Sequence, residues 1–155
     1  AGSDVREQLG QLHEWRFNLA TGEVESNALD QDYYCDFPRI NDGLVGYSNR
    51  YTYAARFRVQ DMPVFDGELK YDNETGEIQV HHFGEGCESG EAVFAPCIGG
   101  SEEDDGYVIC FVYDPVSETS ECQIIDARNF EAQPVARIKI PQRVPHGFHA
   151  SWVNA

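Results

Sequence analysis

Apolar and polar residues alternate along several short stretches of this chain. Between Leu12 and Leu19 every second residue falls on one face, which carries Trp15 and Phe17. A period of two indicates a half-buried β-strand. Residues 69–82 and 108–125 each consist of a strand-like run, a polar turn that contains Asp, Asn, Ser or Gly, and a second strand-like run, and this pattern predicts hairpins. No stretch has the period of a long amphipathic helix; Val5–Leu12 allows one or two helical turns at most.

The hairpins recur at a regular spacing. Phe17, Tyr71 and Tyr113 each precede a turn, and they stand 54 and then 42 residues apart. Hairpins that repeat every ~40–50 residues are typical of β-propeller blades. A β-sandwich is the competing interpretation, because it also consists of many short strands. We therefore predict an all-β, antiparallel fold, in which the apolar run Gly106–Tyr113 is a central strand.

The composition of the chain limits the classes of partner that the protein is expected to bind. The 155 residues suit one domain or a piece of a larger one. A formal net charge of -16 argues against nucleic acid and gives no support to contact with anionic membranes, since both require a positive surface. The five cysteines form no C-x-x-C pair, so we expect reduced thiols in a cytoplasmic protein without structural zinc.

An acidic turn at Glu102–Asp105 raises the alternative of a calcium-binding β-domain. The turn lacks the alternating oxygen ligands of a calcium loop. A solvated loop is the favoured interpretation.

The last residues contain the most distinctive chemistry. A turn at Pro145–Gly147 leads to His149 and then to an apolar run that ends with Trp152 and Val153. We expect this run to be tied down as a strand, with His149 in a packed environment. A neutral imidazole there is a good metal ligand; a core histidine bonded to a carbonyl is the alternative.

Residues 143–149, Arg-Val-Pro-His-Gly-Phe-His, resemble the C-terminal signature of the carotenoid cleavage oxygenases. That family includes the lignostilbene dioxygenases and the retinal pigment epithelium protein. Three further stretches, Asp36–Ile40, Gly90–Pro96 and Glu102–Asp114, agree with the family in order and spacing. The resemblance extends from about Leu12 to Val153.

The resemblance implies a seven-bladed propeller, of which residues 1–155 are the C-terminal part of a single domain. In this family four histidines hold a ferrous ion, and three carboxylates hold three of those histidines. His149 matches the last ligand, and Glu91 matches one of the supporting glutamates. Asp36 stands where the family usually has another glutamate, and its side chain is one methylene shorter. A ferrous ion is bound by neutral imidazoles. A carboxylate at the other ring nitrogen holds each such imidazole in the right tautomer and orientation.

The remaining candidates follow from the same comparison. His146 stands where the family often has an aromatic residue, and we expect His146 and Phe148 to be structural or to face the substrate. The other three iron ligands have no counterpart here and would come from a missing N-terminal portion of the propeller. The implied activity is Fe(II)-dependent cleavage, with dioxygen, of a carbon–carbon double bond in a hydrophobic carotenoid, apocarotenoid or stilbene, giving two carbonyl products. The alternative is a non-catalytic propeller module that has lost the metal.

Overall fold

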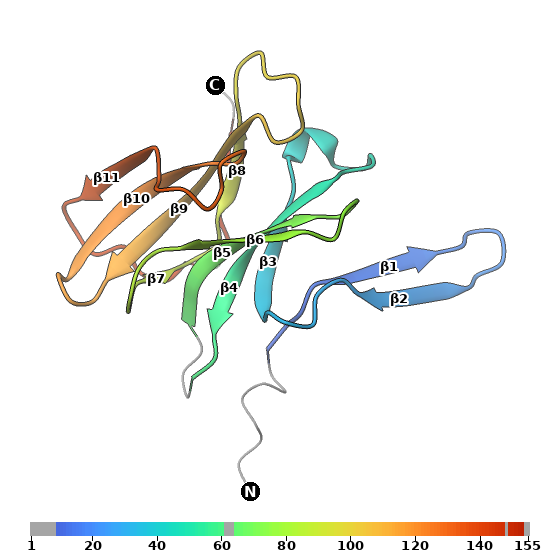
Figure 1. The fold of residues 1–155 in the computed structure, drawn as a ribbon, viewed down its shortest axis with the longest axis horizontal. Helices are drawn as coiled ribbons and strands as arrows, with labels where there is room; N and C mark the ends of the chain where they lie inside the picture. The colour runs from blue at the N-terminus through green and yellow to red at the C-terminus, as the bar shows by residue number, and fades with distance from the viewer. Residues whose placement is uncertain (1–8, 61–63, 148, 154–155) are drawn as a thin grey trace, which may run out of the picture.

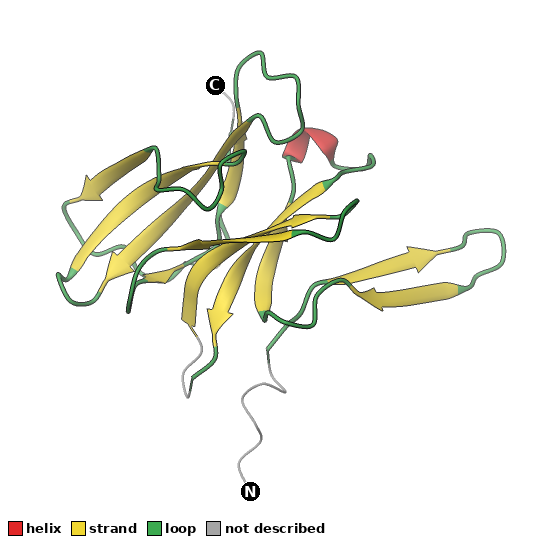
Figure 2. Ribbon diagram, viewed as in Figure 1, coloured by secondary structure: helices red, strands yellow, loops and turns green. Residues whose placement is uncertain are grey.

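The computed structural model describes residues 9–60, 64–147 and 149–153, and their regular structure is almost entirely β-strand (Figures 1 and 2). Every strand pairing in this part of the chain is antiparallel. The strands are β1 His13–Phe17, β2 Val24–Ala28, β3 Cys35–Arg39, β4 Tyr51–Arg58, β5 Val64–Asp72, β6 Ile78–His82, β7 Glu88–Ser89, β8 Val93–Pro96, β9 Gly106–Asp114, β10 Thr119–Asp126 and β11 Ala136–Ile140, with one short 3-10 helix at Asp42–Leu44. The predicted all-β class is confirmed.

Two four-stranded meanders make up the body of the molecule. Strands β3, β4, β5 and β6 pair in sequence order, and so do β8, β9, β10 and β11. A meander of four antiparallel strands is the unit of a propeller blade, so we call these sets blade 1 and blade 2. The short strand β7 joins them, because Ser89 pairs with Phe65 on β5 and with Val112 on β9.

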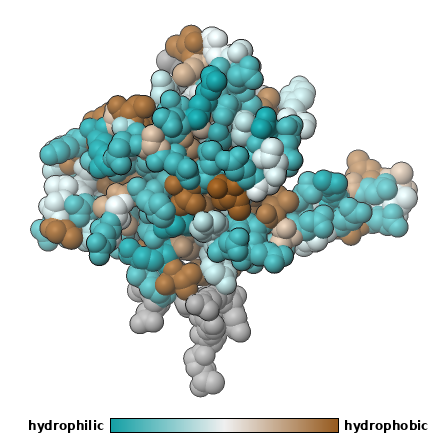
Figure 3. Space-filling view, viewed as in Figure 1, coloured by the Kyte–Doolittle hydropathy of each residue, from teal (hydrophilic) through white to brown (hydrophobic). Residues whose placement is uncertain are grey.

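The hairpin of β1 and β2 forms a sheet of its own and projects away from both blades (Figure 1). The space-filling view shows that this arm is largely hydrophilic, with apolar side chains towards its tip (Figure 3). The predicted strand is confirmed at His13–Phe17, but its predicted half-burial is wrong, because Trp15 and Phe17 are both more than half exposed.

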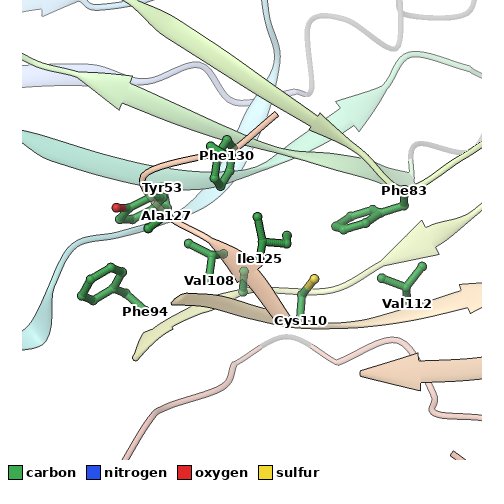
Figure 4. Close-up of a cluster of buried hydrophobic side chains, with 10 residues drawn as sticks. Tyr53, Phe83, Phe94, Val108, Cys110, Val112, Ile125, Ala127 and Phe130 are labelled. Carbon is green, nitrogen blue, oxygen red and sulfur yellow. The ribbon is translucent and has the colours of Figure 1, made fainter. Parts of the chain in front are cut away.

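A hydrophobic cluster between the two blades holds them together (Figure 4). Its members come from both blades and from the loop after β10; they are Tyr53, Phe83, Ala92, Phe94, Val108, Cys110, Val112, Ile125, Ala127 and Phe130. The opposite face of blade 1 packs on a second cluster around Leu69 and Tyr71. Adjacent residues of a strand point to opposite faces, so β4 supplies Tyr53 to the first cluster and Ala54 to the second. Each fully buried large apolar side chain stabilises the fold by about 1.5–3 kcal/mol.

The hairpins β5–β6 and β9–β10 lie where the strand–turn–strand pattern predicts them, and β9 is central, with β10 on one side and β7 and β8 on the other. Of the predicted helical turn, residues 5–8 lie outside the described residues, and residues 9–12 form no helix. No helix among the residues that the structure describes is both long and apolar enough to cross a membrane.

The expectation of a C-terminal strand is wrong. The described residues after β11 form no strand, and Trp152 and Val153 are exposed. Side chains hold this segment in place of a strand ladder: the Val144 N–H donates to Oγ of Ser120 at 2.9 Å, and the Ala150 N–H donates to Glu91 at 2.7 Å. We call residues 143–150 the C-terminal segment.

Candidate functional site

Corresponding places on the two blades carry an acidic residue. Asp36 is the second residue of β3, the first strand of blade 1, and Glu91 stands two residues before β8, the first strand of blade 2. The C-terminal segment runs alongside Glu91. The acidic positions thus recur from blade to blade, and the segment that carries His149 meets the second of them.

Glu91 has neighbours at both carboxylate oxygens. Its side chain is only 4% exposed, and Oε2 accepts the Ala150 N–H while lying 3.3 Å from Nδ1 of His149. Oε1 lies 3.7 Å from Nε of Arg39. A buried carboxylate is costly unless donors or cations surround it. This arrangement turns Nδ1 of His149 towards the acid and leaves Nε2 available to a ligand.

His149 itself lies at the surface of the described structure. Its side chain is 81% exposed, and its ring packs edge-on against Phe37 at a centroid distance of 5.4 Å. The expectation of a packed environment is therefore wrong, and so is the core-histidine alternative. The reason is that side-chain contacts with Ser120 and Glu91 hold the C-terminal segment, which joins no sheet.

His81 is a core histidine bonded to a carbonyl, which is the alternative that was considered for His149. It is buried, and its Nδ1 donates to the Phe130 carbonyl at 2.9 Å. Burial lowers the pKa of His81, so its imidazole is neutral. The next residue, His82, is exposed, because adjacent residues of a strand point to opposite faces.

Phe37 is a site residue that sequence reasoning missed. It directly precedes Pro38, where an extended backbone is favoured, yet its φ is 54° and β3 bulges between Asp36 and Arg39. This conformation places the Phe37 ring against both His149 and Phe65. A non-glycine residue at positive φ is uncommon and often marks a functional position; no local signal in the sequence predicts it.

Asp36 is exposed, and its Oδ1 accepts the N–H of Phe37 at 2.8 Å. It contacts no histidine through any hydrogen bond or ion pair between described residues. Its role as the support of a ligand histidine stays a prediction, because the ligands it would serve have no counterpart in this chain.

The other two candidates lie along the same segment. Nε2 of His146 donates to Oε2 of Glu88 at 3.0 Å, and Phe148 lies outside the described residues. A cavity of about 220 Å³ opens between Glu88–Glu91, Phe111–Tyr113 on β9 and the C-terminal segment, and both His146 and His149 line it. The structure thus brings Glu91, His146 and His149 around one cavity.

The described residues supply one candidate ligand for a metal ion. They contain no group of three or more histidine, cysteine, aspartate or glutamate side chains arranged to hold a metal. What they do contain is an exposed imidazole oriented by a buried carboxylate, which is the usual arrangement for a single histidine ligand. The donor set therefore fits a single ligand position of a metal ion, and the described residues contain no group that would complete the coordination.

The acidic turn is engaged by protein donors. The Glu103 carboxylate accepts the N–H groups of Arg50 and Tyr51 at 2.7–2.9 Å. Asp104 pairs with Lys70 and Asp105 with Arg128, each at 2.7 Å. The contacts of Glu103 and Asp104 tie this turn of blade 2 to blade 1, and the Asp105–Arg128 pair ties it to the loop after β10.

Comparison with known proteins identifies the class of protein to which this fold and site belong. The sequence model of the family "Retinal pigment epithelial membrane protein" matches residues 2–154. The carotenoid 9,10(9',10')-cleavage dioxygenase 1 of Pisum sativum is 37% identical over 99% of this chain, and the apocarotenoid-15,15'-oxygenase of Synechocystis is 34% identical over 94%. The crystal structure of a cobalt-substituted apocarotenoid oxygenase from Synechocystis superposes with a TM-score of 0.87 at 29% identity over 94% of this chain.

The fold is thus that of the β-propeller oxygenases, and the sandwich alternative is excluded. The chain belongs to the retinal pigment epithelial membrane protein family, which contains carotenoid cleavage dioxygenases. It spans 31% and 30% of the length of the two relatives and 30% of the solved chain.

Proposed function

We propose that this chain supplies one iron ligand, His149, and its supporting carboxylate, Glu91, to a non-haem Fe(II)-dependent dioxygenase. The enzyme would cleave a carbon–carbon double bond of a carotenoid or apocarotenoid, or of a stilbene, to two carbonyl products. Family membership and the printed activities of the relatives support the reaction class. The observation that carries the proposal is the 3.3 Å approach of Glu91 Oε2 to Nδ1 of His149.

Glu91 has the task of orienting His149. A carboxylate at Nδ1 selects the tautomer that has its proton on Nδ1, so the lone pair of Nε2 is free for a metal. The second contact, to the Ala150 N–H, fixes the backbone next to the ring. Ferrous iron, when bound, supplies the binding and activation of dioxygen. The ligands that complete its coordination come from residues outside this chain.

Apolar side chains near His149 have the task of placing the substrate. Phe37 packs against the His149 ring, and Phe111 lines the adjoining cavity. Aromatic surfaces of this kind suit a flat conjugated polyene and exclude water from it.

The test uses the protein at its full natural length, reconstituted with ferrous iron, beside His149→Ala. We expect about one iron per wild-type chain and carbonyl products from a carotenoid, an apocarotenoid or a stilbene, with both iron and products lost in the variant. His13→Ala is the matched control, because His13 lies exposed on the projecting hairpin. A wild-type protein without iron or cleavage would instead support the non-catalytic module.

The predicted cytoplasmic location stays part of this proposal. Its support is that all five cysteines are unpaired thiols. Imaging of a fluorescent fusion of the full-length protein tests it.

A further inference from the structure

A second histidine–carboxylate pair lies beside the first. Glu88 and His146 are joined at 3.0 Å, and Glu91 and His149 lie 3.3 Å apart. The two acids are three residues apart in sequence, as are the two histidines, so residues 88–91 lie alongside the part of the C-terminal segment that carries His146 and His149. Between the two pairs the backbones approach closely: a Cβ added at Gly90 would lie 3.2 Å from the carbonyl oxygen of Gly147.

We propose that the Glu88–His146 pair is a positioning contact that sets the register of the C-terminal segment, so that His149 meets Glu91. This inference rests on the proposed function for the importance of His149. The pair itself binds neither the substrate nor the metal. It acts by fixing the position of His146, three residues before His149 in sequence.

The C-terminal segment needs such a contact because no strand ladder fixes it. Its described anchors are few: Arg143 lies over the Tyr113 ring at 4.5 Å, and the N–H groups of Val144 and Ala150 each donate to a side chain. Among the described residues between Val144 and Ala150, His146 makes the hydrogen bond that holds the segment to the body of the fold, through Glu88 on β7. A slip of one residue in an extended segment moves each side chain by about 3.3 Å. That shift would carry His149 beyond contact with Glu91.

The exposure of the His146 and Glu88 side chains indicates whether the pair affects global stability or only the local order of the segment. The side chain of His146 is 49% exposed and that of Glu88 is 21% exposed. Exposed ion pairs add little to global stability. We therefore expect loss of the pair to leave the unfolding midpoint nearly unchanged and to increase local opening of the segment.

A role in binding substrate is the rival account, since His146 also lines the cavity. The two accounts differ in the protein without metal or substrate. A positioning residue changes the exchange of the Ala150 N–H there, whereas a substrate contact leaves that exchange unchanged and alters KM alone.

The experiment compares five full-length variants with wild type: His146→Phe, which keeps a ring but loses the donor; His146→Gln, which keeps a donor; Glu88→Ala; the double variant that combines His146→Phe with Glu88→Ala; and His13→Phe as the surface control. Hydrogen exchange of the peptide that contains Ala150 is measured first in metal-free protein. Ferrous affinity, kcat and KM follow.

We expect His146→Phe and Glu88→Ala each to speed exchange at Ala150 and to weaken ferrous affinity by about tenfold, the lower end of the range for lost partners of a metal ligand. kcat should fall with KM nearly constant, and the double variant should be no worse than either single one. His146→Gln should recover most of the loss, and His13→Phe should match wild type. Wild-type exchange in His146→Phe, or a rise in KM alone, would overturn the proposal. Because exchange is read without iron, it decides this point even if the full-length protein proves inactive.

Discussion

Nε of Arg39, on the first strand of blade 1, lies 3.7 Å from Oε1 of Glu91, which precedes the first strand of blade 2. The other oxygen of Glu91 holds the C-terminal segment through Ala150. One buried acid therefore joins three parts of the chain that are distant in sequence. Its charge is acceptable in a buried place because the guanidinium and an N–H group face it.

Removal of the guanidinium should destabilise this junction. Arg39→Met keeps a long side chain but leaves the buried Glu91 without its cation, and we expect a loss of about 1–3 kcal/mol in the free energy of unfolding. The matched control is Arg16→Met, because Arg16 pairs with Glu14 on the exposed hairpin; it should change stability by no more than about 0.5 kcal/mol. Urea denaturation of the full-length variants measures both values. Equal losses would contradict a special role for the Arg39–Glu91 pair.

Two glycines offer a matched steric test of the close approach beside the site. A Cβ at Gly90 would lie 3.2 Å from Gly147 O, whereas a Cβ at Gly147 would meet nothing within 4 Å among the described residues. Gly90→Ala should push the C-terminal segment outward and weaken ferrous affinity by up to about tenfold. Gly147→Ala should bind iron as wild type does. Titration of ferrous iron into both full-length variants gives the comparison, and an equal effect at both positions would contradict the packing described here.

The sequence pattern predicts hairpins well because their pairing is local. In β5–β6 and β9–β10 the two strands are joined by a few turn residues, so alternation and turn chemistry together specify register. The grouping of strands into two blades could be expected only from the spacing of the hairpins. Strand β7, which joins the blades with two residues, has no pattern long enough to recognise.

The sequence likewise predicts some features of the candidate site and not others. Resemblance to a known signature pointed to His149 and Glu91, and the structure brings them together. The exposure of His149 could not be foreseen, since apolar neighbours in sequence normally indicate burial. Contacts such as His146 with Glu88, 58 residues apart, depend on how the segment crosses blade 2, and periodicity holds no information about that crossing.

The acidic turn allows a test of whether its carboxylates stabilise the fold or bind a metal ion. Glu103 accepts two backbone N–H groups, those of Arg50 and Tyr51, whereas the adjacent Glu102 is exposed. Glu103→Ala leaves both donors unpaired and should cost about 1–3 kcal/mol in the free energy of unfolding, while Glu102→Ala should stay within about 0.5 kcal/mol of wild type. Thermal and urea unfolding with and without calcium measure both effects. A calcium-dependent rise in the melting temperature that Glu103→Ala abolishes would contradict the structural role.

The burial of Glu68 on β5 leads us to predict that the stability of the protein depends on pH in a distinctive way. Its side chain is fully buried, and neither carboxylate oxygen has a hydrogen-bond partner among the described residues. Burial, and secondarily the negative charge of Glu91, raise the pKa of Glu68 well above its ordinary value. The folded protein therefore retains a proton at pH values where the unfolded chain, with a glutamate pKa of about 4.3, has lost it.

This difference in bound protons sets the sign of the effect. Because the folded state binds more protons than the unfolded state above pH ~4.3, the free energy of unfolding falls as the pH rises, by up to about 1.4 kcal/mol per pH unit, until the folded pKa is passed. Glu68→Gln, which is neutral at every pH, should lack this decline and gain stability relative to wild type between pH 5 and 8. Urea unfolding across that range measures the gap, with the exposed Glu25→Gln as the control whose curve should run parallel to wild type. A Glu68→Gln curve that also runs parallel would mean that Glu68 is ionised in the folded protein, with a cation or water beside it.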